Sequence, residues 1–239
     1  MKRNRSKSGA FFALAFLTLL WAGCSDSGSG SSSSNEISGT VTEILPGMVE
    51  SETPVSDVLV CQFNSNNCAT TDENGFYSLL ALMNQNILLS YVKEGFGPVL
   101  VAIPSRVTNI TADAGMSTNE TLAEFFDSIG AAFPPVASGY LTANTFRDGT
   151  PIARINYRLV GSDGLSFYFD DEGVADTSLI ETQTPGSGGF VDVAPVDVEL
   201  VVQGAANCVA ANSWPAPAAD AFRLPIRVGF WTQTVVECE

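Results

Sequence analysis

Five cysteines carry the most distinctive chemistry in this chain of 239 residues, and they divide into one that stands alone and four that can pair. An odd count in an exported chain indicates that one cysteine has a separate role, and Cys24, which follows a short apolar run, fits that role. The other four allow three pairings in a compartment where disulfides persist. We predict Cys61–Cys68, which would close the short excursion "CQFNSNNC", and Cys208–Cys238, which would hold the last strand.

Carboxylates are the other groups that could do chemistry, and most of them gather in the second half of the chain. The cluster to consider is Asp170, Asp171 and Glu172 in "FYFDDEG", followed by Asp192, Asp197 and Glu199. Paired carboxylates can cleave glycosides, and six to eight carboxylate and carbonyl oxygens can hold calcium. Adjacent acids on a β-turn usually point apart into water instead. A carboxylate-dependent carbohydrate-active enzyme and a calcium-stabilised adhesion stalk therefore stay as alternatives, and our prediction is no catalytic residue.

The absence of histidine narrows the reaction classes further. A Ser-His-Asp or Cys-His nucleophile has no base, and zinc hydrolysis by histidine ligands is excluded with it. The cysteine spacings are also longer than those of structural zinc sites. We therefore predict no enzyme, no metal and no cofactor. Four aromatic residues could form a sugar-stacking face, although core or loop packing is the expectation for Phe167, Tyr168, Trp214 and Trp231.

The residues before Cys24 read as a signal peptide. A basic head precedes an apolar run over residues 10–22, which is shorter than the ~20 apolar residues of a spanning helix. The sequence Ala22-Gly23-Cys24 resembles the lipobox of bacterial lipoproteins, with Trp21 where leucine is usual. The resemblance implies cleavage after residue 23 and acylation of Cys24, by several chains (palmitate among them), which would anchor the protein stably. Ser25 implies sorting to the outer membrane.

A Ser/Gly-rich tether over residues 24–35 would follow the cleavage site and hold the folded part clear of the lipid headgroups. Removing residues 1–23 changes the formal net charge from −15 to −19, because 7 basic and 26 acidic residues remain. Such a surface repels nucleic acid, whose binding depends on lysine and arginine. The predicted partners are the membrane, through the lipid anchor, and an extracellular protein or glycan.

Short strands separated by turn residues fill residues 36–104, which predicts a β-sandwich or barrel. The stretches "ISGTV", "TPVSDVLV", "ATTDENGFY" and "LLSYVKEGF" resemble the carboxypeptidase regulatory-like domain, and the element from Thr71 to Phe76 is the most specific. The resemblance implies an antiparallel β-sandwich of the transthyretin kind. In the carboxypeptidases this module carries neither zinc ligands nor a catalytic base, so the resemblance implies a scaffold.

Between residues 105 and 135 the pattern changes to that of a connector with a helix from Thr118 to Ile129. Apolar residues fall on one helical face, and Ser117 with Glu120 forms a capping-box pattern. An exposed face for a partner is one interpretation. The expected one is packing against a neighbouring sheet by Leu122, Phe125, Phe126 and Ile129.

Residues 136–239 return to alternating strands, as in "IARINYRLV". The order of elements repeats the first half: Ser138-Gly139 echoes Ser38-Gly39, "TPI" echoes "TPV", and "TQTPGSGGFVDV" echoes "TTDENGFYSL". We therefore predict a second, divergent β-sandwich, for which an immunoglobulin-like topology also fits. The predicted fold is all-β, with two small antiparallel sandwiches in tandem joined by a helical connector. The predicted function is a non-catalytic, membrane-anchored scaffold or binding module.

Overall fold

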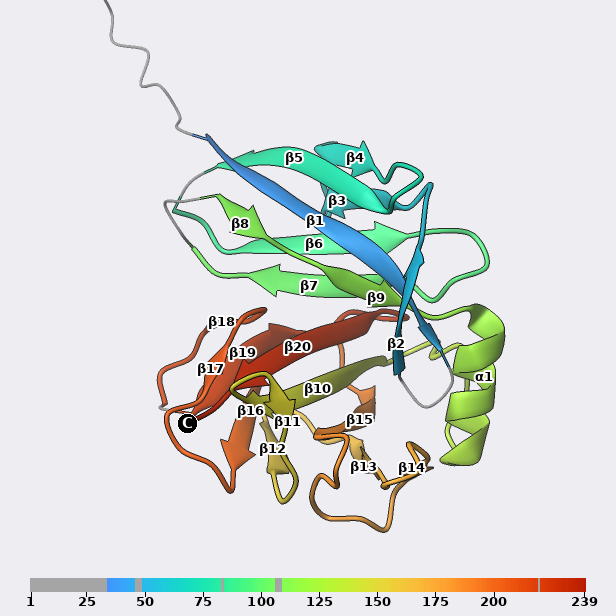
Figure 1. Cartoon of the computed structure of the whole chain (residues 1–239), viewed down its shortest axis with the longest axis vertical. Coiled ribbons are helices and arrows are strands. Elements are labelled where there is room, and N and C mark those ends of the chain that lie inside the picture. Colours follow the sequence, from blue (N-terminus) through green and yellow to red (C-terminus); the bar gives the residue numbers. More distant parts are fainter. Residues whose placement is uncertain (1–33, 46–48, 83, 106–108, 219) are drawn as a thin grey trace, which may run out of the picture. The chain divides into compact units, whose positions relative to one another are not determined.

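The computed structural model describes residues 34–45, 49–82, 84–105, 109–218 and 220–239. In this part of the chain, strands dominate and the one helix is short, which confirms the all-β sandwich prediction (Figure 1). No helix in the described ranges has the length and apolar character needed to cross a bilayer. The predicted signal peptide, Cys24 and most of the predicted tether lie outside the described residues.

The first half forms two facing sheets. In one sheet β1 (Ser34–Leu45) is central, since it pairs with four other strands. These are β2 (Val49–Pro54), β5 (Phe76–Leu82), β8 (Ile110–Thr111) and β9 (Ala114–Met116). The facing strands run in the order β4-β3-β6-β7. Their bounds are β3 (Leu59–Gln62), β4 (Cys68–Thr70), β6 (Ile87–Val92) and β7 (Val99–Ile103).

The second half repeats this arrangement. Its first sheet runs β14-β13-β15-β10-β20, with β11 beside β10 and β17 beside β20. The facing sheet has the order β12-β16-β19-β18. The bounds in the first sheet are β10 (Gly139–Arg147), β11 (Thr150–Pro151), β13 (Leu165–Phe169), β14 (Ala175–Asp176), β15 (Ser187–Val193), β17 (Val209–Ala210) and β20 (Trp231–Glu237). Those in the facing sheet are β12 (Asn156–Val160), β16 (Asp197–Gln203), β18 (Trp214–Pro215) and β19 (Ala221–Pro225).

Hydrogen bonds between threonine side chains and the backbone occur at equivalent places in the two halves, which shows that the halves have the same arrangement of strands and loops. Buried Thr71 accepts a hydrogen bond from Val58 N–H and donates to Val55 C=O. Buried Thr182 makes the same pair of bonds, to Ile155 N–H and Ile152 C=O. Thr71 therefore links the loop before β3 to the segment before β5, and Thr182 links the loop before β12 to the segment before β15.

A glycine turn is repeated in the same way. The carbonyl of Gly75 accepts a hydrogen bond from Val41 N–H, and that of Gly186 accepts one from Thr145 N–H. Both glycines have positive φ, 71° and 66°, and a Cβ on either would lie within 3.0 Å of a backbone oxygen. Only glycine fits these two turns without strain.

The register corrects one of the predicted echoes. Aligning Val41 with Thr145 places Thr142 and Ala143 of β10 where Ser38 and Gly39 lie in β1. Ser138-Gly139 therefore lies four residues before the true equivalent. Gly139 is required for another reason, because a Cβ there would come 2.5 Å from the Arg227 carbonyl oxygen.

The halves are joined by main-chain pairing. β20 lies parallel to β7, with Trp231 opposite Val99 and Gln233 opposite Val101, so that one 11-stranded sheet crosses both halves. β8 and β9 also run parallel to β1, and β20 runs parallel to β10. The pairing is thus mixed where antiparallel sandwiches were predicted, because the last strand of each half enters after a long connection. Residues 32–239 form one compact unit, and the predicted domain boundaries stay a prediction.

The predicted helix is present as α1 (Asn119–Ser128), and it packs against both halves, with Leu122 beside Gly97 of the first. Leu122 and Phe126 are fully buried, and the Phe126 ring lies 4.9 Å from that of Tyr140. The cap differs from the prediction: Thr118 Oγ1 accepts the Thr121 N–H, whereas Ser117 donates its hydroxyl to the Ile44 carbonyl. Ser117 is therefore buried as a link to β1.

Candidate functional site

A cleft of about 440 Å³ lies between the two halves and is lined by both. One wall is the outer face of the β1, β8 and β9 sheet, which contributes Thr40, Thr42, Thr111, Asp113 and Gly115. The other wall is the face of β10 and β20 opposite to the face that packs into the hydrophobic core of the second half, which we call the second core. The loop after β17 also contributes to this wall. Its lining residues include Thr142, Asn144, Ala211, Asn212, Gln233 and Val235.

The alternation of β10 explains why polar side chains reach the cleft. Leu141 and Ala143 point into the second core, which places Thr142 and Asn144 on the opposite face. Thr40 of β1 and Asn144 of β10 occupy equivalent places in the repeated frame. The cleft is therefore formed where the corresponding outer faces of the two sandwiches meet.

Gln233 holds the two walls together. Its Nε2 donates to the Gly115 carbonyl oxygen at 2.7 Å, and its Oε1 accepts the Gly115 N–H at 3.2 Å. A glutamine amide has one donor end and one acceptor end, so this pair of bonds imitates the pairing of a neighbouring strand. The edge of β9 is thereby satisfied, and a Cβ on Gly115 would clash with the Ile44 side chain.

Other polar groups in the cleft are partly used within the protein. Asp113 Oδ1 accepts the Thr40 N–H at 2.8 Å and its hydroxyl at 3.0 Å. The indole N–H of buried Trp231 donates to Thr142 Oγ1 at 2.8 Å. Asn144 Oδ1 accepts a hydrogen bond from the Ser187 hydroxyl at 2.6 Å, so the Asn144 NH₂ group points away from Ser187.

Three side chains in the cleft that reach solvent retain their full hydrogen-bonding capacity, and the hydroxyl of Thr234, which also lines the cleft, is buried without a partner among the described residues. Within the described residues, the side chains of Thr42, Thr111 and Asn212 make no hydrogen bond to protein. Asp113 is the one charged side chain among the described lining residues, and neither lysine nor arginine is among them. The cleft therefore disfavours an anionic ligand, because an anion would meet Asp113 without a compensating cation.

The predicted carboxylate cluster lies elsewhere, at the exposed turn between β13 and β14, and its members serve the backbone. Asp170 Oδ1 accepts the N–H groups of Glu172 and Val174. Asp171 Oδ1 accepts the hydroxyl of Thr184 at 2.6 Å and its N–H at 3.1 Å. These two hydrogen bonds to the charged form lower the pKa of the Asp171 carboxyl.

The remaining acids considered from the sequence lie in β15 and β16, where Asp197 and Glu199 share one face of β16. Asp192 accepts the Ser138 hydroxyl, and Asp197 forms ion pairs with Arg223 at 3.3 Å and Arg227 at 3.1 Å. No group of three or more metal-binding side chains occurs within the described ranges. The structure thus does not bring the predicted acids together with the cleft.

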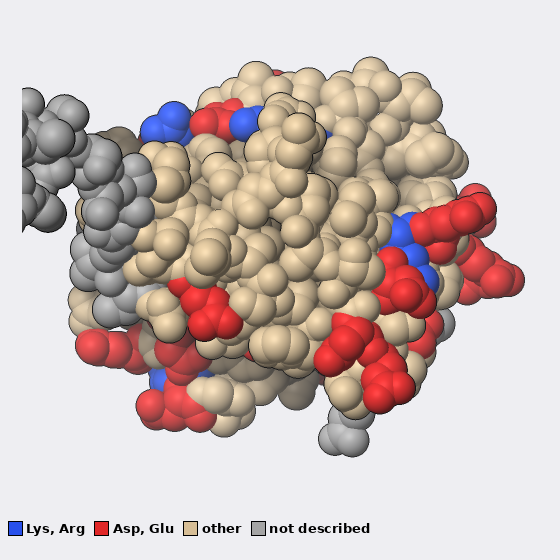
Figure 2. All heavy atoms as spheres, turned by 90° about the horizontal axis from the view of Figure 1, so that it is seen from above, with Lys and Arg blue, Asp and Glu red and all other residues tan. Residues whose placement is uncertain are grey.

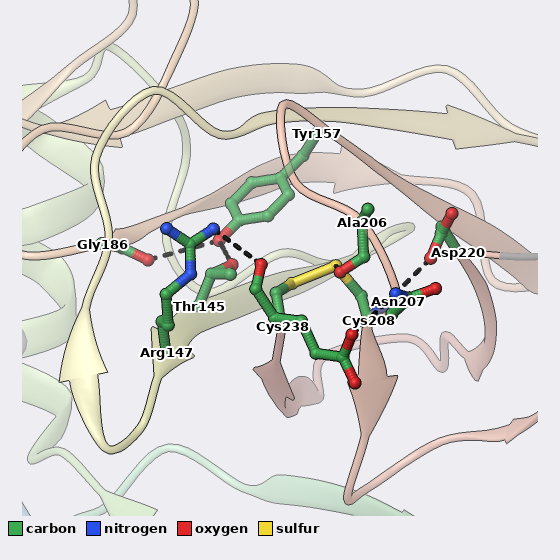
Figure 3. The surroundings of a disulfide bond; sticks show 10 residues. Thr145, Arg147, Tyr157, Gly186, Ala206, Asn207, Cys208, Asp220 and Cys238 are labelled. Carbon is green, nitrogen blue, oxygen red and sulfur yellow. Dashed lines mark hydrogen bonds between the residues drawn. A yellow bond between two sulfur atoms is a disulfide. The ribbon is translucent and has the colours of Figure 1, made fainter.

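Both predicted disulfides are present. Cys61 and Cys68 face each other across β3 and β4, and Cys208 joins Cys238, just after β20. Figure 3 shows the second bridge beside Tyr157, whose hydroxyl bonds to Thr145 and to the Gly186 carbonyl. This disulfide therefore fixes the loop before β17 at the end of β20, close to the buried polar centre of the second sandwich.

The aromatic residues considered for sugar stacking are packed inside the protein, as expected. Phe167, Tyr168 and Trp231 are buried, and Trp214 is partly buried with its indole N–H donating to the Ile87 carbonyl at 3.0 Å. The cleft residues, by contrast, were missed. Their alternation predicts outer strand faces, but no sequence pattern says that two such faces meet.

No protein-family model matches the sequence, and no significant match is found among curated proteins. Among solved structures, a chain of a type II cohesin–X-dockerin complex from Acetivibrio cellulolyticus is 16% identical with a TM-score of 0.30. That match covers 36% of this chain and 58% of the other.

Two further solved structures are similar over more of the chain. The minor pilin GBS52 of Streptococcus agalactiae is 14% identical with a TM-score of 0.29, covering 85% of this chain and 95% of the pilin. A DUF3823 family protein from Parabacteroides merdae is 12% identical with a TM-score of 0.25, covering 81% and 97%. Identity and TM-score are both low, and the sandwich assignment rests on the chain's own strand pairing.

Proposed function

We propose that this protein is a non-catalytic bacterial lipoprotein of the outer membrane that binds a neutral polar ligand, a glycan or a polar protein segment, in the cleft between its two sandwiches. The anchor would be acylated Cys24, and the Ser/Gly tether would separate the folded part from the lipid. The first sandwich would be a module of the carboxypeptidase regulatory-like kind, which serves as a scaffold.

The observation that carries this proposal is the composition of the cleft. A volume of about 440 Å³ falls within the range of ligand pockets, and hydroxyl and amide groups from both halves converge on it. Thr42, Thr111 and Asn212 are free to bond a ligand. One carboxylate without a second acid or a base supplies no acid–base pair, so binding is the chemistry that these groups favour.

The test is a binding screen with the mature chain from Cys24, using neutral oligosaccharides and uncharged Ser/Asn-rich peptides as probes. For any probe that binds, we expect Thr42→Val with Thr111→Val to weaken affinity roughly tenfold, because two hydrogen bonds of about 0.5–1.5 kcal/mol are removed. The shape of both side chains is kept, so thermal stability should stay unchanged.

The matched control is Thr70→Val on exposed β4, whose side chain also makes no hydrogen bond within the described residues. This control should leave affinity unaltered. Equal affinity in the cleft variant and the control would place binding elsewhere and remove the cleft from the proposal. The anchor is tested separately by the intact mass of the membrane-extracted protein, which should lack residues 1–23 and carry added lipid.

A further inference from the structure

The first sandwich carries a wide surface with few charges, although the chain as a whole is strongly acidic. Between Val58 and Val92 the only charged residues are Asp72 and Glu73, both in the turn before β5. This segment supplies β3, β4, β5 and β6. Figure 2, viewed from the side on which β4 and β5 lie in Figure 1, shows a broad area free of charged side chains, with the acids gathered toward its margins.

Strand β5 adds apolar side chains to this surface. Tyr77, Leu79 and Ala81 point into the core, and the alternate residues point outward. Three of these outward residues are large and apolar, and their exposed fractions are 45% for Phe76, 61% for Leu80 and 48% for Leu82. β5 pairs with β1 on one side only among the described strands, so its row of apolar groups lies at a sheet edge.

The position of this row relative to the chain entry is the second observation. β1 begins at Ser34, which lies directly opposite Leu82 in the β1–β5 ladder. The sequence places Cys24 only ten residues before Ser34. A flexible Ser/Gly chain of that length has a root-mean-square reach of about 16–19 Å, from roughly 5–6 Å times the square root of its length. The Leu82 end of β5 would thus stay near whatever holds Cys24.

We infer that the outer face of β5, formed by Phe76, Ser78, Leu80 and Leu82, rests on the lipid surface beside the anchor. The inference depends on the proposed anchoring at Cys24. Strongly acidic faces are repelled by anionic headgroups, whereas this face borders on one carboxylate, that of Glu36 in β1, which lies opposite Leu80 and accepts the Ser78 hydroxyl at 2.7 Å. Three apolar side chains bind a bilayer weakly on their own, but the short tether raises their effective concentration at the surface.

The experiment separates this contact from the acylation step. The chain from Cys24 to Glu239 is coupled through its one thiol outside the two disulfides to a maleimide lipid in phosphatidylcholine vesicles. Leu80→Trp reports on the β5 face. The control is Val209→Trp on β17 of the second half, where the valine is 65% exposed. Lipids brominated near the headgroup quench tryptophans that touch the bilayer.

We expect brominated vesicles to quench the added emission of Leu80→Trp by at least twofold and to shift it to shorter wavelength. The Val209→Trp chain should match the parent chain, whose Trp214 and Trp231 give the background. Amide hydrogen exchange of the unsubstituted chain gives a second readout, because β5 should exchange more slowly when the chain is coupled to vesicles than when it is free.

Equal quenching of the two variants, with unchanged exchange in β5, would overturn the inference. A blue shift of Leu80→Trp without quenching, accompanied by dimers in sedimentation, would also overturn it and assign the face to a second copy of the chain. Because coupling at Cys24 is chemical, failure of acylation in cells would contradict the proposed function while leaving this result intact.

Discussion

The two sandwiches share a frame and differ at the edge formed by the last strand of each. In the first half that strand is split into β8 and β9, and its edge is covered by the Gln233 side chain at Gly115. In the second half the equivalent strand is the continuous β20, which pairs with β10 and then with β7 of the first half. The hydrogen bonds of Thr71 and Thr182 inside the two sandwiches are equivalent. The edge of β20, in contrast, pairs with β7 and so joins the two halves. A repeated fold can thus diverge at its edges and keep its core contacts.

Alkaline titration is the strongest test of whether the halves behave as one unit. Burial raises the pKa of Tyr77 and Tyr91 in the first half, of Tyr157 in the second and of Tyr140 at the joint. Unfolded tyrosines ionise near pH 10, so this stability is complete below pH ~10 and is lost as pH rises toward the folded pKa values. Each tyrosine then costs about 1.4 kcal/mol per pH unit.

We therefore expect unfolding between roughly pH 11 and 12, as one transition in circular dichroism that coincides with the tyrosinate absorbance change. Without histidine the stability should be nearly flat from about pH 6 to 9. Two resolved alkaline transitions would show that the halves unfold independently in spite of the β7–β20 pairing.

The disulfides should differ in energy between the halves. On the chain-entropy model the bridge with a sequence separation of 30 is worth about 4 kcal/mol, and that with a separation of 7 about 2–3 kcal/mol. Urea unfolding of Cys208→Ala with Cys238→Ala, beside Cys61→Ala with Cys68→Ala, checks the order. A larger loss from the first-half pair would mean that strand packing, not loop closure, decides their contribution.

The repeated threonines should be worth the same in both halves. Thr71→Val and Thr182→Val each remove the hydroxyl that bridges a buried N–H and a carbonyl, so we expect each to destabilise by about 1–3 kcal/mol. Denaturant melts of the two variants should agree within about 0.5 kcal/mol. The Ser variants at both positions keep the hydroxyl and serve as controls. A large difference between the halves would break the equivalence of the two frames.

The smallest expected change in stability is that from removing a tyrosine hydroxyl, and it should differ between Tyr77, inside the first sandwich, and Tyr140, where the two halves join. The Tyr77 hydroxyl bonds to the Ala112 carbonyl at 2.6 Å and to Tyr91 at 2.7 Å, so Tyr77→Phe should cost about 1–2 kcal/mol. Among the described residues the buried Tyr140 hydroxyl has no partner, and Tyr140→Phe should be neutral or stabilising by up to ~1 kcal/mol. Thermal melts give both values, and a loss at Tyr140 would reveal a bound water.

Local features of the fold followed from the sequence because they depend on neighbouring residues. The helix periodicity from Leu122 to Ile129, the turn before Phe76 and the repeated order of elements each have a physical signature within about a dozen residues. The two disulfides were predicted from pairing and compartment, and the structure confirms them. Acylation of Cys24 stays a prediction, because it lies outside the described residues.

The joint and the cleft could not be read in advance. Pairing between β7 and β20 uses backbone N–H and C=O groups, which nearly all residues carry, so Val99 and Trp231 give no sign of being partners. The side chain of Gln233 would look like any solvent-facing residue on an alternating strand. The pairing and the cleft between the two halves therefore could not be predicted from local sequence patterns.

The central place of β1 has a mechanical consequence. The chain enters the folded part at Ser34, and β1 is bonded to β5 along one edge and to β8 and β9 along the other. A pull applied at Ser34 along the strand would load these ladders together in shear, since their hydrogen bonds run across the direction of force. A force that enters the described part of the chain at Ser34 would then be resisted by many bonds at once.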